Sequence, residues 1–227
     1  MMKSRTWKRV LAAVCAGVAA VSMAACGGGT NNTANTAKDG VIINSVMNST
    51  SQASLNYNPF SSTALTGVVG ALYEPLFYMN NLKDDPTKLE PLMGKSYTIS
   101  DDAKTIDVTI RDGENWSDCK PYTAEDVAYT FNLLNSNKAL NTSGFAGSAK
   151  VLSDTEVRIT LDKPESVNAL SYLSGTMIVP KHVWEKIDDP VTYTNKDAVG
   201  SGPFTVKGGN FSPTAYTFKK NPYYWDE

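Results

Sequence analysis

Cysteine and histidine are scarce in this chain of 227 residues, which has 3 Cys and 1 His. Cys15 and Cys26 belong to an N-terminal stretch that precedes the folded part, so Cys119 alone remains in the folded part, and one thiol cannot form an internal disulfide. A zinc site needs several Cys or His ligands, and His182 has only this one Cys to combine with. We therefore predict no internal disulfide, no structural metal and no cofactor.

Long apolar runs are also missing. The run Val10–Val21 has about a dozen residues, whereas a helix that spans a bilayer needs about 20. It follows the basic stretch Met1–Arg9, and a basic stretch followed by a short apolar run is typical of an export signal. The sequence therefore predicts export across a membrane without a permanent transmembrane anchor.

The end of this run, Ser22–Gly27, resembles a bacterial lipobox, in which small residues precede a Cys that becomes lipidated. Met23 is a departure, because the pattern usually has Leu there. We predict a lipoprotein signal peptide at 1–25 and lipidation of Cys26. The alternative is a conventional signal peptide cleaved near Ala25.

Residues 26–40 contain no large apolar side chain and are predicted to form a flexible tether. Its expected reach is about 20 Å, so the domain would work at the membrane but outside it, on the extracytoplasmic face. The alternative is a plain N-terminal tail without an anchoring role.

Positive charge is low once the signal is set aside. The formal net charge is −2, from 21 basic and 23 acidic residues. Four of the basic residues lie before residue 10, so 17 basic and 23 acidic groups remain after residue 25, a net charge of −6. This acidic balance argues against nucleic acid as a partner.

Hydrophobic periodicity predicts alternating hairpins and helices in the part at 41–227. Leu65, Val68, Val69 and Leu72 share one helical face, while alternation in 105–111 indicates a half-buried strand. The predicted strands are 41–46, 76–79, 95–100, 105–111, 149–152 and 156–161, and the predicted helices are 63–73, one capped by Thr123, one from 166 to 173 capped by Ser166, and 181–187. The fold class predicted from this order is α/β, as a lobe with a mixed sheet rather than a doubly wound one.

Several motifs then carry a resemblance to a known family. They are Leu72–Leu76, Thr109–Gly113, Trp116–Val127, Ile178–Trp184, Val199–Phe204 and Lys219–Trp225. In this order they resemble the extracytoplasmic solute-binding proteins of peptide-type ABC transporters, family 5. Cys119 is a departure, because the family usually has Gly there in a tight turn.

The resemblance implies a two-lobed periplasmic-binding-protein-like fold that closes over a peptide or similar small solute. It also implies delivery of the solute to ABC transporter permease subunits, with the membrane contacted through the lipid anchor. Family members continue beyond the Lys219–Trp225 motif, so we expect 41–227 to be the N-terminal part of the protein, with the second lobe missing. The alternative is a naturally short protein with a single lobe.

Five candidate ligand-binding residues follow from the resemblance and from local chemistry. Gly200, Ser201 and Gly202 form a loop whose small residues allow close backbone approach. Its alternative is a simple turn at the entry to a strand. Tyr73 and Glu74 are expected to offer a ring and a carboxylate to a ligand ammonium. Their alternative is a core tyrosine and a locally paired carboxylate.

Three further candidates are placed near the cleft by the resemblance. Asn58 and Phe60 lie in an early loop, and Thr176 precedes a strand. Trp116 is instead predicted to pack its own loop, although a stacking role remains open. The aromatic cluster Tyr223–Trp225 is expected to be exposed as a sticky patch.

Two other function classes are alternatives to a solute-binding protein. Cys119, His182 and Asp118 could supply a nucleophile, a base and an orienting carboxylate, but the sequence has no GxSxG, HExxH or P-loop motif. We therefore predict that the protein is not an enzyme. A surface adhesin or structural lipoprotein, which needs only the anchor and the tether, is the alternative to a transport role.

Overall fold

The computed structural model describes residues 55–85 and 87–226. Four predictions therefore lie outside the described residues: the signal peptide 1–25, the lipidated Cys26, the tether 26–40 and the strand 41–46. Within the described ranges, no helix has the length and apolarity that crossing a membrane requires.

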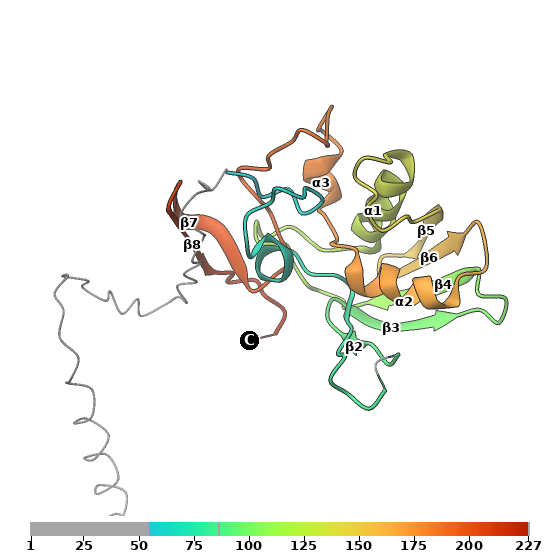
Figure 1. The fold of residues 1–227 in the computed structure, drawn as a ribbon. Coiled ribbons are helices and arrows are strands. Elements are labelled where there is room, and N and C mark those ends of the chain that lie inside the picture. The colour runs from blue at the N-terminus through green and yellow to red at the C-terminus, as the bar shows by residue number, and fades with distance from the viewer. Residues whose placement is uncertain (1–54, 86, 227) are drawn as a thin grey trace, which may run out of the picture. The chain divides into compact units, whose positions relative to one another are not determined.

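The described chain alternates short strands and helices, as Figure 1 shows. In chain order the elements are η1 (Val68–Leu72), β1 (Phe77–Tyr78), β2 (Glu90–Pro91), β3 (Gly94–Ile99), β4 (Thr105–Ile110), α1 (Ala124–Ser136), β5 (Gly147–Ser153), β6 (Glu156–Leu161), α2 (Ser166–Gly175), α3 (Lys181–Trp184), β7 (Phe204–Ser212) and β8 (Ala215–Lys220). The α/β prediction is confirmed, and the pairs among these strands are antiparallel.

The two predicted hairpins form one four-stranded sheet with the order β3-β4-β6-β5. In β4 the alternation sorts the side chains as expected: Ile106, Val108 and Ile110 are buried, and the residues between them are half-buried. Ile106 pairs with Ile99 on one side and with Ile159 on the other. The sheet therefore has one apolar face, which must be covered.

Helix α1 packs against β5 and β6 and buries Val127, Phe131 and Leu134. It begins as predicted after Thr123, whose backbone N–H donates to Asp126 Oδ2 at 2.9 Å. This bond satisfies one of the backbone groups that a helix start leaves free. The predicted capped helix is confirmed.

A side chain of α1 also covers the edge of the sheet. Asn132 Nδ2 donates to the Ala149 carbonyl at 2.9 Å, and Asn132 Oδ1 accepts from the Ala149 N–H at 2.9 Å. An edge strand exposes unpaired backbone groups to other chains. The amide of Asn132 supplies partners for one residue of edge strand β5.

The buried side chains form two clusters. The first lies between the sheet and the helices α1 and α2, and the second lies around η1, α3 and the hairpin β7-β8. The chain leaves the second cluster at Tyr73 and enters the first at Leu76, and it returns along 177–179. We call the place where these crossings meet the junction, defined by Glu74, Ser117, Thr176 and Gly200–Gly202.

The predicted helix 63–73 is wrong, because only the short turn η1 forms there. Gly67 and Gly70 have φ of 89° and 88°, a left-handed backbone that a regular helix does not contain. Val69 is extended at φ −81° and ψ 125° and is 55% exposed rather than on the buried face. Two glycines thus override the apolar periodicity.

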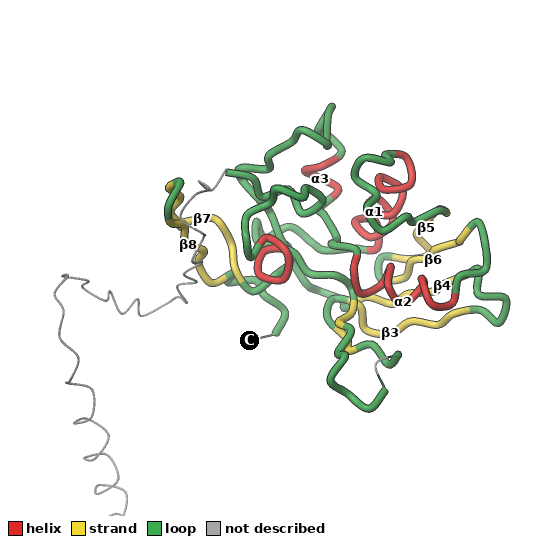
Figure 2. The backbone as a smooth tube through the Cα atoms, viewed as in Figure 1, coloured by secondary structure: helices red, strands yellow, loops and turns green. Residues whose placement is uncertain are grey.

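The boundaries of other helices differ from the predicted ones by a few residues. Ser166 is the first residue of α2 and Glu165 holds the cap position, so the cap prediction is wrong. Helix α3 ends at Trp184 instead of Ile187, and Figure 2 shows loop from there to β7. The hairpin β7-β8 was not predicted, because its register shifts between Thr205 and Asn210 and the alternation is lost.

Candidate solute-binding site

The junction brings together five of the eight predicted binding residues. The Glu74 N–H donates to Ser201 Oγ at 3.4 Å, and the Glu74 carbonyl accepts from the Ile178 N–H at 3.3 Å. Thr176 lies two residues before Ile178, and Gly200 and Gly202 flank Ser201. These residues therefore lie where the chain passes between the two clusters.

The two junction glycines permit a close approach of backbones. A Cβ at Gly200 or at Gly202 would clash with the backbone of residues 71–72. The Gly200 N–H and C=O bond to the Ser117 hydroxyl and N–H at 3.1 and 3.0 Å. The Gly202 C=O accepts from Asn221 Nδ2 at 2.9 Å. These backbone groups have partners within the chain, and their contact with a solute stays a prediction.

Glu74 is buried, with 7% of its surface exposed. Its carboxylate accepts from the Tyr224 hydroxyl at 2.9 Å and from Trp225 Nε1 at 3.3 Å. Burial raises the pKa of Glu74, and the two donors partly oppose this effect. Burial and the Glu74 carboxylate in turn raise the pKa of the Tyr224 hydroxyl. Glu74 therefore has hydrogen-bond donors within the chain, as the alternative of a locally paired carboxylate expects.

The same contacts correct the prediction of an exposed aromatic patch. Tyr224 and Trp225 are half-buried, and the Arg111 guanidinium lies 3.9 Å from the centre of the Trp225 ring. Tyr223, at 39%, is the exposed member of the three. The residues Tyr224 and Trp225 fold back over Glu74 because its carboxylate accepts both of their donors.

A second buried carboxylate, Asp126, was predicted only as part of a helix start. Its Oδ1 accepts from the Lys181 N–H at 2.8 Å, and its Oδ2 accepts from Trp116 Nε1 at 3.1 Å. Asp126 is 4% exposed, and burial raises its pKa although these donors oppose the rise. The structural role predicted for Trp116 is confirmed, since its ring is fully buried. The capping pattern was the only sequence signal for Asp126.

Phe60 packs against the second cluster, and Asn58 directly follows its member Tyr57. Asn58 is fully buried, and its Nδ2 donates to the carbonyls of Pro190 and Tyr193 at 3.0 and 2.9 Å. Phe60 is half-buried and packs edge-on against Trp184, with ring centres 5.4 Å apart. Asn58 thus joins two distant loops, while Phe60 is the one candidate of the eight that is not buried.

Tyr73 and Thr176 are also buried. The Tyr73 hydroxyl accepts from Asn195 Nδ2 at 2.7 Å, and burial is the main cause that raises its pKa. Thr176 is 3% exposed, and its hydroxyl has no hydrogen-bond partner among the described residues. Neither side chain is accessible to solvent in this structure.

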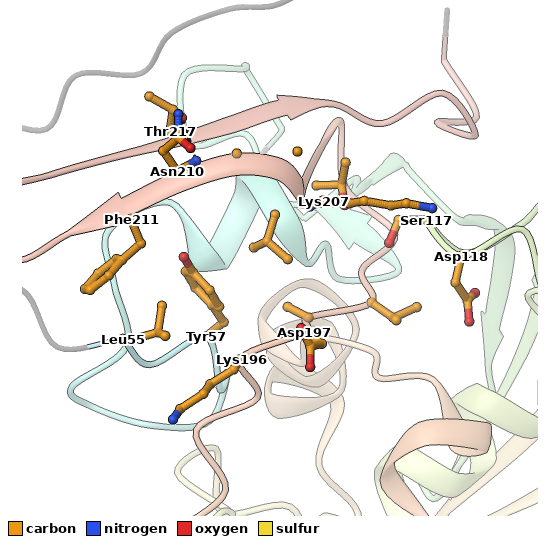
Figure 3. Close-up of a pocket in the computed structure, with 16 residues that line it drawn as sticks. Leu55, Tyr57, Ser117, Asp118, Lys196, Asp197, Lys207, Asn210, Phe211 and Thr217 are labelled. Carbon is orange, nitrogen blue, oxygen red and sulfur yellow. Dashed lines mark hydrogen bonds between the residues drawn. The ribbon is translucent and has the colours of Figure 1, made fainter.

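The described residues also line a half-open cavity of about 540 Å³, which Figure 3 shows in close-up. Its walls come from three parts of the chain: residues 55 and 57, residues 117 and 118, and residues 196–217 in part. None of the eight predicted residues lines it, although Ser117, the bonding partner of Gly200, does. Sequence reasoning missed this cavity.

The cavity wall is part apolar and part polar, and Lys196, Asn210 and Thr217 lie on the same side as its apolar residues (Figure 3). Leu55, Tyr57 and Phe211 lie together at one end, and Ser117 and Asp118 lie at the other (Figure 3). An apolar wall with a few polar groups is typical of a site for a small organic solute. The arrangement can hold such a solute.

The structure brings together only two of the three residues considered as nucleophile, base and orienting carboxylate. His182 Nε2 lies 2.9 Å from Asp118 Oδ2, but no hydrogen bond within the described ranges joins Cys119 to His182. Cys119 is exposed and has φ of 70°, the conformation for which Gly is better suited. This agrees with the tight turn that the resemblance implied for this position.

Comparisons with known proteins point to one family. The model of bacterial extracellular solute-binding proteins, family 5 Middle, matches residues 88–227. Protein XP55 of Streptomyces lividans is 32% identical over 150 residues, which cover 64% of this chain and 27% of that protein. The peptidoglycan-binding protein YepA of Agrobacterium fabrum is 30% identical and covers 74% of this chain and 29% of its own length.

A solved structure supports the same assignment. The mannohexaose-bound periplasmic oligopeptide-binding protein of an ABC transporter from Thermotoga maritima matches with a TM-score of 0.67 and 28% identity. The match covers 77% of this chain and 32% of that protein. The chain thus spans about a third or less of the length of these relatives. It belongs to the bacterial extracellular solute-binding proteins of family 5.

Proposed function

We propose that this chain forms part of an extracytoplasmic binding protein that captures peptides or similar small solutes and delivers them to ABC transporter permease subunits. The observation that carries the proposal is the family 5 match over residues 88–227. The names of several relatives describe binding proteins, so in this proposal the chain binds its solute without catalysis. No observation favours the adhesin or structural lipoprotein.

The solute lies in the cavity of about 540 Å³, a size within the usual range for small-ligand sites. Two of the eight residues predicted from the sequence, Gly200 and Asn58, hold segments of the cavity wall in place. Gly200 fixes Ser117 in the cavity wall through two hydrogen bonds, at 3.0 and 3.1 Å. Asn58 fixes the loop 190–193, which leads directly into the wall residues 196–199.

These 227 residues bind a solute weakly on their own. The chain spans about a third of its relatives, so it makes only part of the contacts that a complete protein makes. Immobilising a solute costs free energy that few contacts offset. The expected dissociation constant is above about 1 mM, which corresponds to ~4 kcal/mol.

The proposal also places the domain on the outer face of the cytoplasmic membrane. The signal peptide, the lipobox-like segment ending at Cys26 and the polar stretch 26–40 support a lipid anchor followed by a tether. An anchored binding protein stays close to its permease, which raises its effective concentration there.

An NMR titration of the full chain with the dipeptide Ala-Phe, up to about 20 mM, tests the location of the solute. The expected result is a set of amide shift changes that includes Ser117, Val199 and Val206. The variant Val206→Trp fills the cavity from β7 and should weaken binding at least about five-fold, or ~1 kcal/mol.

The matched control is Val167→Trp, because Val167 is 78% exposed on α2 and does not line the cavity. It should bind the dipeptide like the unmodified chain. Shift changes that are absent at the highest concentration, or equal in both tryptophan variants, would show that the cavity does not hold the solute.

A further inference from the structure

The segment that follows β8 runs back from the hairpin β7-β8 to the sheet. It begins at Asn221, directly after β8, and its residue Trp225 packs against the first cluster. The hairpin itself belongs to the second cluster through Tyr216 and Phe218. We call Asn221–Trp225 the strap, because it joins the two clusters.

The base of the strap is held by two hydrogen bonds. The Asn221 N–H donates to the Pro203 carbonyl at 2.8 Å, and Asn221 Nδ2 donates to the Gly202 carbonyl at 2.9 Å. Beyond the base, the N–H groups of Tyr223 and Tyr224 donate to the Asn221 side chain and carbonyl at 3.1 and 3.4 Å. These two backbone groups therefore bond within the strap rather than to the body of the domain.

Side-chain contacts hold the far end of the strap. The Tyr224 hydroxyl and Trp225 Nε1 donate to the two oxygens of the Glu74 carboxylate at 2.9 and 3.3 Å, and the Arg111 guanidinium lies over the Trp225 ring. Glu74 is buried, and its carbonyl accepts from the Ile178 N–H. The carboxylate is thus fixed by the core of the domain, while the half-buried rings of the strap lie on top of it.

We propose that the strap opens at its far end while the four-stranded sheet stays folded, and that the closed strap locks the hairpin β7-β8 against the first cluster. Segments with few buried contacts and few backbone hydrogen bonds to the core open at a lower free energy than the core itself. The strap has both properties beyond Asn221.

The lock has a consequence for the cavity. The hairpin contributes Val206, Phe211 and Thr217 to the cavity wall, so a closed strap also fixes the position of that wall. The inference goes beyond the proposed function, because it concerns a motion of the domain and does not need a solute in the cavity.

Native-state hydrogen exchange of the full chain, followed by NMR, tests the proposal. In the unmodified chain, the Trp225 indole N–H and the Tyr223 amide should be protected, yet exchange at least about a hundred-fold faster than the amides of β4 at the centre of the sheet. Low urea should leave the exchange of the strap protons unchanged, because opening the strap exposes little surface.

The variant Tyr224→Phe keeps the ring and removes one of the two donors to Glu74. It should accelerate exchange of the strap protons at least about ten-fold, the value of a hydrogen bond to a charged group. The amides that pair β7 with β8 should accelerate by the same factor, because the hairpin moves only after the strap opens.

The matched control is Tyr78→Phe, because Tyr78 lies on β1, outside the strap, and is 53% exposed. It should leave the exchange of the strap protons unchanged. Strap protons that exchange no faster than β4, or without any protection, would overturn the opening strap. Equal acceleration in both variants would overturn the role of Glu74, and acceleration of the strap protons alone would overturn the lock on the hairpin. Each of these outcomes leaves the proposed function intact.

Discussion

At the scale of single residues, two buried carboxylates connect segments that are far apart in the sequence. Asp126 accepts from the backbone of Thr123 and Lys181 and from the Trp116 ring. Glu74 accepts from Tyr224 and from Trp225, which lie about 150 positions later in the sequence. A buried carboxylate is costly without donors, so these donors determine where the segments lie.

The buried position of Glu74 predicts a pH dependence. The unfolded chain loses the Glu74 proton near pH 4.3, whereas burial raises the pKa of the folded state above that value. The folded protein therefore binds more protons in this window, and the contribution of Glu74 to the free energy of unfolding falls as the pH rises through it. In Glu74→Gln this fall is absent, so the stability of the variant relative to wild type should rise from about pH 4 to 7.

Urea unfolding at several pH values measures this effect. Glu90→Gln is the control, because Lys83 and Asn80 lower the pKa of the half-buried Glu90. Its stability relative to wild type should fall as the pH rises toward about 4.3. If plots of the free energy of unfolding against pH run parallel for wild type and Glu74→Gln, the result would contradict a buried, ionisable Glu74.

The role of individual junction residues could not be predicted from the sequence for a physical reason. Tyr224 lies 150 positions after Glu74, and Ser201 lies 127 positions after it. Local patterns do not reveal which distant group satisfies a buried carboxylate. The need for glycine at 200 and 202 was predicted, but the backbone that approaches them in the structure is that of residues 71–72.

At the scale of elements, sequence patterns were sufficient where one local rule dominated. The hairpins β3-β4 and β5-β6 follow from period-two alternation, and α1 follows from Thr123 and Asp126 at its start. The patterns failed where a local exception entered. Gly67 and Gly70 break the predicted helix 63–73.

The cavity is a tertiary feature, and no element contains it. Its walls combine a loop before η1, the turn at Ser117 and Asp118, and the segment that runs from the loop 196–199 into the hairpin β7-β8. The irregular register of β7-β8 hid that hairpin from the alternation analysis. The cavity therefore became visible only when the packing of these three segments was known.

At the scale of the whole molecule, the position of the domain relative to the membrane depends on Cys26. Two acyl chains suffice for stable attachment. Expression in a bacterium that processes lipoproteins should give a membrane-bound wild type, while Cys26→Ala should be released to the periplasm or the medium. Fractionation and immunoblotting measure the partition. An equal membrane fraction for both proteins would contradict lipidation.

The most direct measurement is a crystal structure of the full chain with the dipeptide Leu-Phe at about 50 mM, well above the expected dissociation constant. The account predicts density for the dipeptide in the cavity. Its apolar side chains should lie against Tyr57 and Phe211. A dipeptide bound elsewhere on the domain, with the cavity empty at this concentration, would contradict the account.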